Sequence, residues 1–387
     1  MTYEYLFLLG NTPALSFAEI RAVFPDAVFS HEYESILKVT LTHALKPEVI
    51  DTLGGTVKIF EHLKTYTETP ESFITELYDA IIADLGTQRT NKITLAIAEI
   101  GRDHLPPIEL ATLKNELIAS SIKTRYIEGS RHGLSSAILS HKKVSEYAII
   151  QTAQGSYLAK TLAVQNIDGW TFKDRGKPYA NRKKGMLPPK VARIMVNLAT
   201  GGAPTPGSVL YDPFCGTGTI LIEALETGID VAGSDTDGES VAGARQNVQW
   251  FIGERGLTHN ASVFQADVSR AMLPIREKIT YLVTEPFLGR QTPQPDQLPG
   301  IFKGLEKMYL GAFRHWRELL APGARIVCIF PCVQKEHTPG YPDAHLHRLI
   351  DKLQEIGYTT TSETVVYHRP QAVISREIYQ FTYTTEK

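Results

Sequence analysis

The segment 209–224, VLYDPFCGTGTILIEA, limits most strongly how this chain can fold. Its residues predict a buried strand that ends at Asp212, then a glycine-rich turn, then a helix. Gly216 and Gly218 have no Cβ, so the backbone there can turn tightly and come close to a ligand. The free N–H groups at the start of the helix point toward whatever lies over the turn. The segment therefore predicts a nucleoside-binding turn in an α/β sheet, although an ordinary glycine-rich strand-to-helix turn has the same pattern.

The spacing of the glycines distinguishes this turn from two common nucleotide motifs. A dinucleotide-binding G-x-G-x-x-G pattern requires glycine at position 221, where this chain has Leu221, and a phosphate loop requires a Gly-Lys-Ser/Thr that does not follow here. The run 212–219, DPFCGTGT, instead resembles the S-adenosylmethionine loop of class I methyltransferases. The resemblance implies that this loop, with Phe214 in it, holds S-adenosylmethionine.

Two further acids follow the next two predicted strands. Asp235 can accept hydrogen bonds from ribose hydroxyls, and the alternative role, capping the next helix, suits Asp237 better. Asp267 can accept from an adenine amine while the N–H of Val268 donates to a ring nitrogen, and the alternative is an ordinary turn aspartate. Parallel strands bring their carboxyl ends to one edge of a sheet, so we expect a single site. The predicted cofactor-binding residues are Asp212, Phe214, Gly216, Gly218, Asp235, Thr236, Asp267 and Val268.

The segment 284–289, TEPFLG, ends another predicted strand at the same edge. An exocyclic base amine is a poor nucleophile because it shares its lone pair with the ring. A side-chain oxygen and a backbone carbonyl that accept its N–H bonds can direct that lone pair toward a methyl donor. We predict Glu285 as the acceptor, Pro286 as the element that fixes the carbonyl, and Phe287 as the ring that stacks on a flipped base. The alternative is a strand end with an inert proline turn.

A basic segment precedes this region. Between positions 173 and 193 the chain has eight Lys or Arg residues and one acid, although its formal net charge is −2. Trp170, Phe172 and Tyr179 are interleaved with these bases. Such a stretch suits a polyanion, since phosphate contacts release counterions and aromatic rings stack on bases. A solvated basic linker is the alternative. The predicted RNA-binding residues are Lys173, Arg175, Lys177, Arg182, Lys183 and Lys184.

The order of elements predicts an α/β protein in four parts. Short strands and helices alternate over 1–66 and again over 67–165, with one short strand expected at 137–139, which predicts a ferredoxin-like unit and a second α/β unit. A basic linker follows at 166–185. Over 186–387, strands separated by helices predict a Rossmann-like parallel sheet with an antiparallel hairpin at its edge, as in class I methyltransferases.

The composition fits a globular protein of a reducing compartment. Its 387 residues are 43% hydrophobic and 21% charged, and three cysteines argue against a disulfide scaffold. No apolar run reaches the roughly 20 residues of a membrane helix, so we expect a cytoplasmic protein without membrane contact. Cys328 and Cys332 with His337, His345 and His347 fit no standard zinc spacing, so we predict no metal.

The chain also resembles a more specific family, the THUMP-domain tRNA guanine-N2 methyltransferases, which modify a guanosine near the base of the D-arm. The resemblance rests on Asp235, the loop 212–219, the block 185–199 (GMLPPKVARIMVNLA) and the segments 163–168 and 174–178. It implies that residues 1–66 are a ferredoxin-like domain, that residues 67–165 are a THUMP RNA-binding domain, and that the partner is tRNA. The family has Asp-Pro-Pro-Tyr at the catalytic turn, and the Glu-Pro-Phe of this chain departs from it.

The expected function is S-adenosylmethionine-dependent methyl transfer to the exocyclic N2 amine of a guanosine in tRNA. We expect a monomer, with a small activating protein as a possible partner. Two alternatives stay open at this point. One is another nucleic-acid amine methyltransferase, acting on rRNA guanine or DNA adenine, and the other is a non-catalytic RNA-binding protein with a decayed methyltransferase motif.

Overall fold

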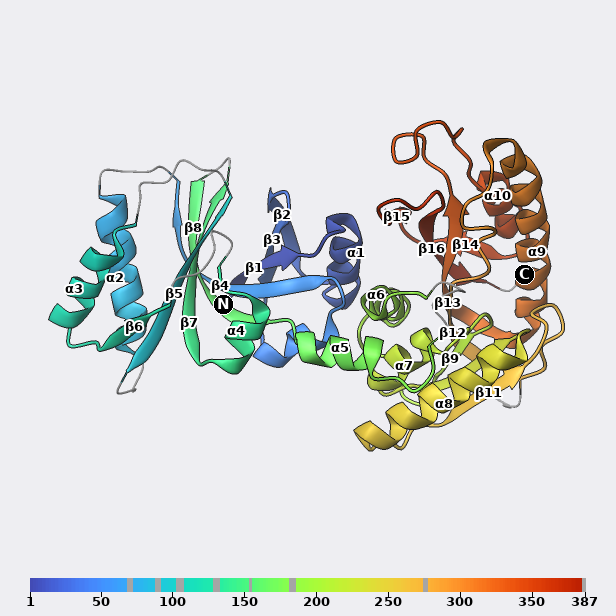
Figure 1. Cartoon of the computed structure of the whole chain (residues 1–387), viewed down its shortest axis with the longest axis horizontal. Coiled ribbons are helices and arrows are strands. Elements are labelled where there is room, and N and C mark those ends of the chain that lie inside the picture. The colour runs from blue at the N-terminus through green and yellow to red at the C-terminus, as the bar shows by residue number, and fades with distance from the viewer. Residues whose placement is uncertain are drawn as a thin grey trace. The chain divides into compact units, whose positions relative to one another are not determined.

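The structure of the chain is a computed structural model (Figure 1). It describes residues 1–67, 72–87, 92–101, 108–127, 133–152, 155–180, 186–273 and 278–384. These residues form two compact units. Unit 1 comprises residues 1–13 and 26–169, and unit 2 comprises residues 14–25 and 170–387. Each unit has its own sheet.

Unit 1 is built on one eight-stranded sheet with the order β2-β3-β1-β4-β8-β7-β5-β6. Its strands are β1 Tyr3–Leu9, β2 Val28–Tyr33, β3 Ile36–Leu41, β4 Thr56–Tyr66, β5 Ile93–Gly101, β6 Thr124–Tyr126, β7 Val144–Thr152 and β8 Gly155–Val164. Strand β4 pairs with β8 along most of its length, so the two small units predicted from the sequence share a continuous sheet. The boundary at residue 66 stays a prediction.

Three helices and one 3₁₀ turn accompany the sheet of unit 1: η1 Pro47–Thr52, α2 Phe73–Gly86, α3 Leu110–Ala119 and α4 Ser136–His141. The apolar side chains of α2 and α3, among them Leu77 and Leu117, share one buried core with side chains of β5 and β7, among them Tyr147. The strand predicted at 137–139 is wrong, because these residues lie inside α4. Ser135 caps that helix by accepting a hydrogen bond from the N–H of Ile138. A three-residue apolar run cannot by itself distinguish a strand from a helix.

Unit 2 contains the parallel sheet predicted for the C-terminal half. Its order is β11-β10-β9-β12-β13-β16-β14, with β15 paired to β16. The strands are β9 Val209–Asp212, β10 Asp230–Asp235, β11 Ala261–Gln265, β12 Ile279–Thr284, β13 Leu320–Cys332, β14 Tyr358–Thr360, β15 Val365–Tyr367 and β16 Ser375–Tyr383. Strands β9 to β13 are parallel, and β16 is antiparallel to β13. This is the Rossmann-like arrangement with an antiparallel edge, and it confirms the predicted fold class.

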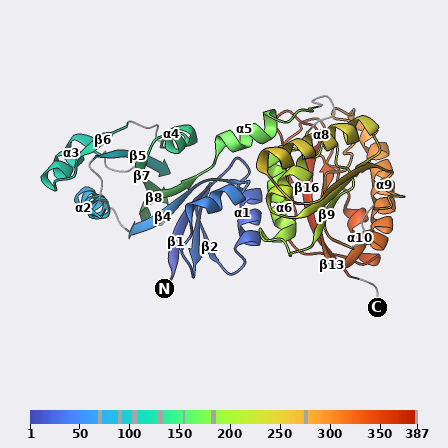
Figure 2. The ribbon, with the colours of Figure 1, turned by 90° about the horizontal axis from the view of Figure 1, so that it is seen from below.

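Helices cover both faces of this sheet (Figure 2). The helical elements that lie wholly or mainly in unit 2 are α1 Pro13–Val23, α5 Ile167–Arg175, α6 Pro189–Thr200, α7 Thr219–Glu226, α8 Gly238–Arg255, the 3₁₀ turn η3 Pro295–Gln297, α9 Leu298–Leu319 and α10 His347–Glu355. One apolar core joins α6, α7 and α8 to the sheet, and a second joins α9 and α10 to it. Burying each such aliphatic side chain stabilises the fold by about 1.5–3 kcal/mol. None of the helices among the described residues has both the length and the apolar character that a bilayer crossing requires.

Helix α1 packs with unit 2 although it lies near the start of the chain. Its Leu15 belongs to the core formed by α6 and α7. The Nδ2 of Asn197 on α6 donates a hydrogen bond to the Oε1 of Glu19 at 2.7 Å, and both side chains are fully buried. A buried carboxylate needs such a donor, because leaving it unpaired carries a large desolvation cost. The first domain predicted from the sequence therefore contributes one helix to the other unit.

Candidate active site

The sheet of unit 2 has a topological switch point between β9 and β12. From β9 the chain continues to β10 and β11 on one side, and β12 pairs with the other side of β9. Ligands of open α/β sheets bind in the crevice at the carboxyl ends of the strands beside such a point. Asp212 ends β9 and Thr284 ends β12, and the Oγ1 of Thr284 donates a hydrogen bond to the Oδ1 of Asp212 at 2.7 Å. The end of β9 and the start of the 285–287 turn therefore meet at one place.

Asp212 is the most perturbed acid of this edge. Its side chain is buried, and burial raises its pKa to about 7, with the nearby Asp235 and Glu285 adding to the effect. Hydrogen bonds from Thr284 and from the N–H of Phe214, at 3.1 Å, act in the opposite direction. Three carboxylates thus lie near one another, and a cationic ligand would relieve their mutual repulsion.

The glycine-rich loop is tied to the end of β10 by Asp235. One oxygen of its carboxylate accepts from the N–H of Gly216 at 3.0 Å, and the other accepts from the N–H of Asp237 at 3.0 Å. Asp237 in turn caps α8 by accepting from the N–H of Ser240 at 2.8 Å, which confirms that the capping role falls to Asp237. Each oxygen of Asp235 keeps a second lone pair, so a ribose hydroxyl can still bind there.

Both glycines of the loop have a left-handed backbone, which suits the tight turn predicted for them. Gly216 has a φ of 49° and Gly218 a φ of 83°. A Cβ at Gly216 would meet no heavy atom of the described residues within 4 Å, so the space above this residue is open to a ligand. A Cβ at Gly218 would lie 3.4 Å from the side chain of Ala244, because α8 packs closely there. Helix α7 begins directly after Gly218.

Asp267, the third acid, lies in a turn after β11. It is exposed, and its Oδ1 accepts from the N–H of Ser269 at 2.8 Å and from its Oγ at 2.6 Å, which lowers the pKa of Asp267. This is the turn arrangement expected under the alternative, and its Oδ2 remains for an adenine amine. Val268 is buried and Thr236 is exposed. Phe214 is half-buried against the core of α9. The contacts of these residues to a cofactor stay predictions.

The turn predicted to be catalytic follows β12 directly. Pro286 is buried, whereas the ring of Phe287 is 62% exposed and so can stack on a base. The hydroxyl of Tyr309, on α9, donates to the carbonyl of Phe287 at 2.7 Å and fixes the main chain beneath that ring. The half-buried Glu285 pairs with Arg376 of β16, with 2.5 Å between Oε1 and Nε. Arg376 could not be found from the sequence, because no local pattern connects residues so far apart in the chain.

The structure corrects two of the predicted RNA-binding residues. Lys173 lies on α5 and is buried, and its Nζ contacts Glu223 at 2.8 Å and Glu226 at 2.7 Å on α7. Lys177 is also buried, and burial lowers its pKa. Neither ammonium group can therefore meet a phosphate in this arrangement. Arg175 is exposed, and the other three predicted residues, Arg182, Lys183 and Lys184, lie outside the described residues.

Tyr179 of the basic segment is linked through Asn247 to the glycine-rich loop. The side chain of Asn247 on α8 accepts from the N–H of Tyr179 at 2.9 Å and donates to the carbonyls of Tyr179 and Thr217, each at 2.9 Å. The ring of Tyr179 lies where a Cβ of Gly243 would be, 2.1 Å from its nearest atom. The hydroxyl of Tyr179 donates to Glu239 at 2.8 Å. No sequence pattern indicated this connection between linker and loop.

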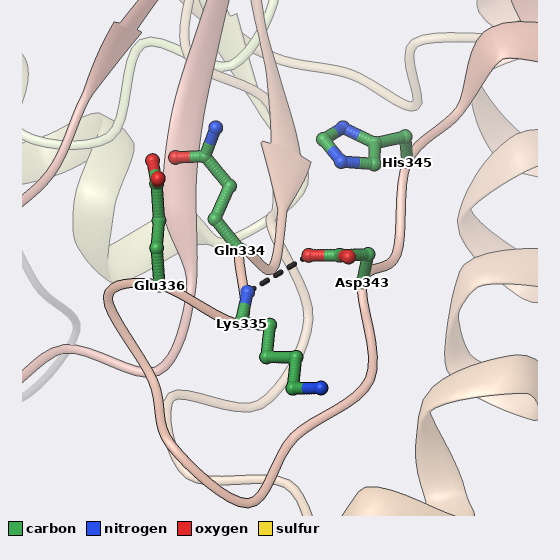
Figure 3. A pocket seen from close by; sticks show the side chains of 5 residues that line it. All are labelled: Gln334, Lys335, Glu336, Asp343 and His345. Carbon is green, nitrogen blue, oxygen red and sulfur yellow. Dashed lines mark hydrogen bonds between the residues drawn. The ribbon is translucent and has the colours of Figure 1, made fainter.

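A separate pocket of about 680 Å³ lies beyond the end of β13 (Figure 3), lined by Gln334, Lys335, Glu336, Asp343 and His345. Beside it, donor atoms of Cys332, His345 and Glu377 lie within 4.8 Å of one another and could hold a metal. The Nδ1 of His345 and the Oε1 of Glu377 are 2.8 Å apart and already form a hydrogen bond. Burial raises the pKa of the Cys332 thiol and so opposes the thiolate that a metal requires. The predicted absence of a metal stays a prediction.

Known proteins are similar to this chain in sequence and in fold. Residues 179–334 match the model of the RMKL-like methyltransferase domain family. The chain is 42% identical over 105 residues to the tRNA (guanine(10)-N2)-dimethyltransferase of Methanothermobacter thermautotrophicus, covering 27% of this chain and 28% of that protein. It is 31% identical over 117 residues to the probable tRNA (guanine(10)-N2)-dimethyltransferase of Methanothermococcus thermolithotrophicus, covering 30% of this chain and 70% of that protein.

The matches cover between 28% and 41% of the length of the first three curated relatives. Over nearly the whole chain the fold is similar to that of TrmN from Thermus thermophilus, with a TM-score of 0.54 and 16% identity across 99% of this chain and 100% of TrmN.

The switch point, the glycine-rich loop and the acids at the strand ends define unit 2 as a class I methyltransferase domain. The similarity to the relatives named above also defines the family of the chain. The chain belongs to the family of the tRNA (guanine-N2) methyltransferases.

Proposed function

We propose that this protein transfers a methyl group from S-adenosylmethionine to the exocyclic N2 amine of a guanosine in tRNA. The hydrogen bond between Thr284 and Asp212 is the observation that carries the proposal. It brings the end of β9 beside the turn that holds Glu285 and Phe287, which supports the proposal that methyl donor and target base bind next to each other. The same activity stands in the names of the relatives that the chain matches.

The residues at the end of β9 and β10 fit S-adenosylmethionine. When bound, this cofactor supplies a methyl group on a positively charged sulfonium that is already a good leaving group. Asp212 and the neighbouring carboxylates favour a cation, because the pKa shift of Asp212 arises from burial and from mutual repulsion. Gly216 leaves space over the loop, and Asp235 retains lone pairs for ribose hydroxyls. Asp267 and the N–H of Val268 are proposed to meet the adenine.

The 285–287 turn is proposed to act on the target base. Phe287 is exposed and stacks on the flipped guanine. Glu285 accepts a hydrogen bond from the N2 amine and takes up the proton that leaves as the new N–C bond forms. The buried Pro286 and the hydrogen bond from Tyr309 to the Phe287 carbonyl keep the main chain in place while this happens. The chemistry needs an oriented amine, and these residues provide the orientation.

RNA binding is proposed for unit 1 and for the bases of the basic segment other than the buried Lys173 and Lys177. Residues 67–165 would act as a THUMP domain, and Arg175, Arg182, Lys183 and Lys184 would contact phosphates. We further propose that the protein works in the cytoplasm as a monomer, with or without a small activating partner. An assay on three kinds of nucleic acid distinguishes this proposal from the alternatives, which are rRNA guanine, DNA adenine or RNA binding without catalysis.

Replacing Glu285 by alanine tests the catalytic assignment. Glu285→Ala should lower methyl transfer to tRNA by about 100-fold or more, since it removes a group that acts on the reacting amine. Cofactor affinity should change much less than in Asp235→Ala. The measurement is nucleoside mass spectrometry of tRNA, rRNA and DNA incubated in parallel with the protein and S-adenosylmethionine, with calorimetry for cofactor binding.

Asp235→Ala is the matched control, because it should weaken cofactor binding first. Full activity of Glu285→Ala would remove Glu285 from the mechanism. A wild-type protein that methylates rRNA or DNA instead of tRNA would replace the substrate, and one that binds no cofactor would support the non-catalytic alternative.

A further inference from the structure

We infer that Arg376 is a positioning residue that holds Glu285 in the orientation needed to accept the target amine. The inference rests on the proposed function and extends it to a residue on another strand. The ion pair between the two side chains, with 2.5 Å between Nε and Oε1, is the observation behind it. Both side chains are largely shielded from water, with 12% of Arg376 and 18% of Glu285 exposed.

The sheet register explains how the two residues meet. Thr284, at the end of β12, lies beside Cys328 of β13, and Cys328 lies beside Tyr379 of β16. Because β16 runs antiparallel, Arg376 lies beside Pro331 and therefore beyond the end of β12. A long side chain at this point reaches back across β13 to the residue that follows Thr284. A shorter one at the same position could not span a strand.

Because the side chain of Glu285 is longer than that of an aspartate, it needs a partner such as Arg376 to fix its orientation. Glu has one rotatable bond more than the Asp found at this position in the resembling family, so its carboxylate samples more positions and costs more entropy to fix. A reacting group must be held within about 0.5 Å of its productive position. A charge-assisted hydrogen bond between half-buried groups is strong enough to select one rotamer. Among the described residues, Oε2 of Glu285 takes no hydrogen bond, and it is the oxygen left for the amine.

Arg376 is itself held in place. Its cross-strand neighbour on β15 is Tyr367, and its guanidinium lies 6.0 Å from the centre of that ring. The planar guanidinium donates to Glu285 through Nε, a geometry that lysine cannot copy. A purely structural ion pair would have the same distance, so the test must separate positioning from stability.

The experiment compares Arg376→Ala, Arg376→Lys and Arg325→Ala in the full-length protein. Arg325 is an exposed arginine of β13 at the opposite end of the same sheet. Its neighbours on the adjacent strands are Tyr281 of β12 and Thr382 of β16. For each variant, kcat and KM of methyl transfer to tRNA, the cofactor Kd and the Tm are measured. The kcat of Arg376→Ala should fall by about 100-fold, the effect of a misplacement of about 1 Å, with the KM for tRNA and the cofactor Kd nearly unchanged.

Chemical rescue adds a second measurement, because free guanidinium would not restore kcat if Arg376 had only a structural role. Adding free guanidinium at low concentration should restore part of the kcat of Arg376→Ala and leave Glu285→Ala and Arg325→Ala as they were. Arg376→Lys should be intermediate. Combining Glu285→Ala with Arg376→Ala should lower kcat no further than Glu285→Ala alone, because Arg376 acts through Glu285.

Three outcomes overturn the inference. They are a wild-type kcat in Arg376→Ala, a fall of kcat matched by an equal fall in Arg325→Ala, and a fall of kcat in Arg376→Ala that guanidinium does not relieve and that follows the decrease in Tm. If the wild type itself methylates no RNA, the proposed function fails and the inference fails with it. This result differs from a failure of the inference alone, because the wild type and all variants are then equally inactive.

Discussion

Asp212 is a buried acid at the end of β9. Its pKa of about 7 arises from burial first and from Asp235 and Glu285 next. Since its pKa is raised, the stability that its neutral form contributes is full below the ordinary pKa of an aspartate and is lost as the pH rises through about 7. A bound cation reverses this preference, because it stabilises the charged carboxylate.

Cofactor affinity should therefore rise with pH. Between about pH 6 and about pH 8, the Kd of S-adenosylmethionine should fall by up to about tenfold per pH unit below the pKa of Asp212 and level off above it. Calorimetric titrations across this range check the expectation. Asp212→Asn keeps the shape of the side chain without the charge and should give a flat profile. A wild-type Kd that does not change with pH would contradict the assignment of Asp212.

At the scale of elements, helix α8 connects the basic segment to the cofactor loop. Asn247 donates hydrogen bonds to the main chain of Tyr179 and of Thr217. Because Gly243 has no side chain, the ring of Tyr179 can pack against it. A side chain at Gly243 would push this ring away, because the Cβ would overlap it. The docking of the linker and the shape of the loop should consequently depend on each other.

Two glycine substitutions in α8 test this dependence. Gly243→Ala should displace Tyr179 and weaken cofactor binding, whereas Gly253→Ala places its Cβ where no heavy atom of the described residues lies within 4 Å. Both changes gain the intrinsic helix preference of alanine, about 1 kcal/mol, so the second isolates the steric effect of the first. Cofactor Kd and thermal unfolding are measured for both. Equal behaviour of the two variants would show that the packing against Tyr179 does not reach the cofactor loop.

At the scale of the whole molecule, the proposed RNA binding is electrostatic and should respond to salt. Replacing Arg182, Lys183 and Lys184 together by glutamine should reduce tRNA affinity. The slope of log affinity against log salt should flatten by about 0.7 to 0.9 for each phosphate that the variant no longer neutralises. Filter binding at several salt concentrations gives this slope.

The control replaces three exposed bases of α9, Lys303, Lys307 and Arg314, by glutamine. It removes the same charge from helix α9 of unit 2. An identical change of slope in both triple variants would mean that net charge alone drives binding. An unchanged slope in the first variant would show that its three residues do not touch the RNA.

Local patterns allowed the C-terminal unit to be predicted in detail. The strand at 209–212, the turn at Gly216 and Gly218 and the helix after it depend on residues that are neighbours in the chain. The predicted RNA-binding role of Lys173 failed for the opposite reason. A run of bases defines the charge of a segment, but not which side of α5 turns toward the acids of α7.

The sequence by itself determined the class of fold, the glycine-rich loop and the position of the turn at Glu285, because backbone freedom at glycine and the alternation of strands and helices act over a few residues. Only the tertiary structure decided that α1 packs with unit 2, that Asn247 joins Tyr179 to Thr217, and that Arg376 meets Glu285. These pairs join residues that lie far apart along the chain. They arise from strand register and helix packing, which no local pattern encodes.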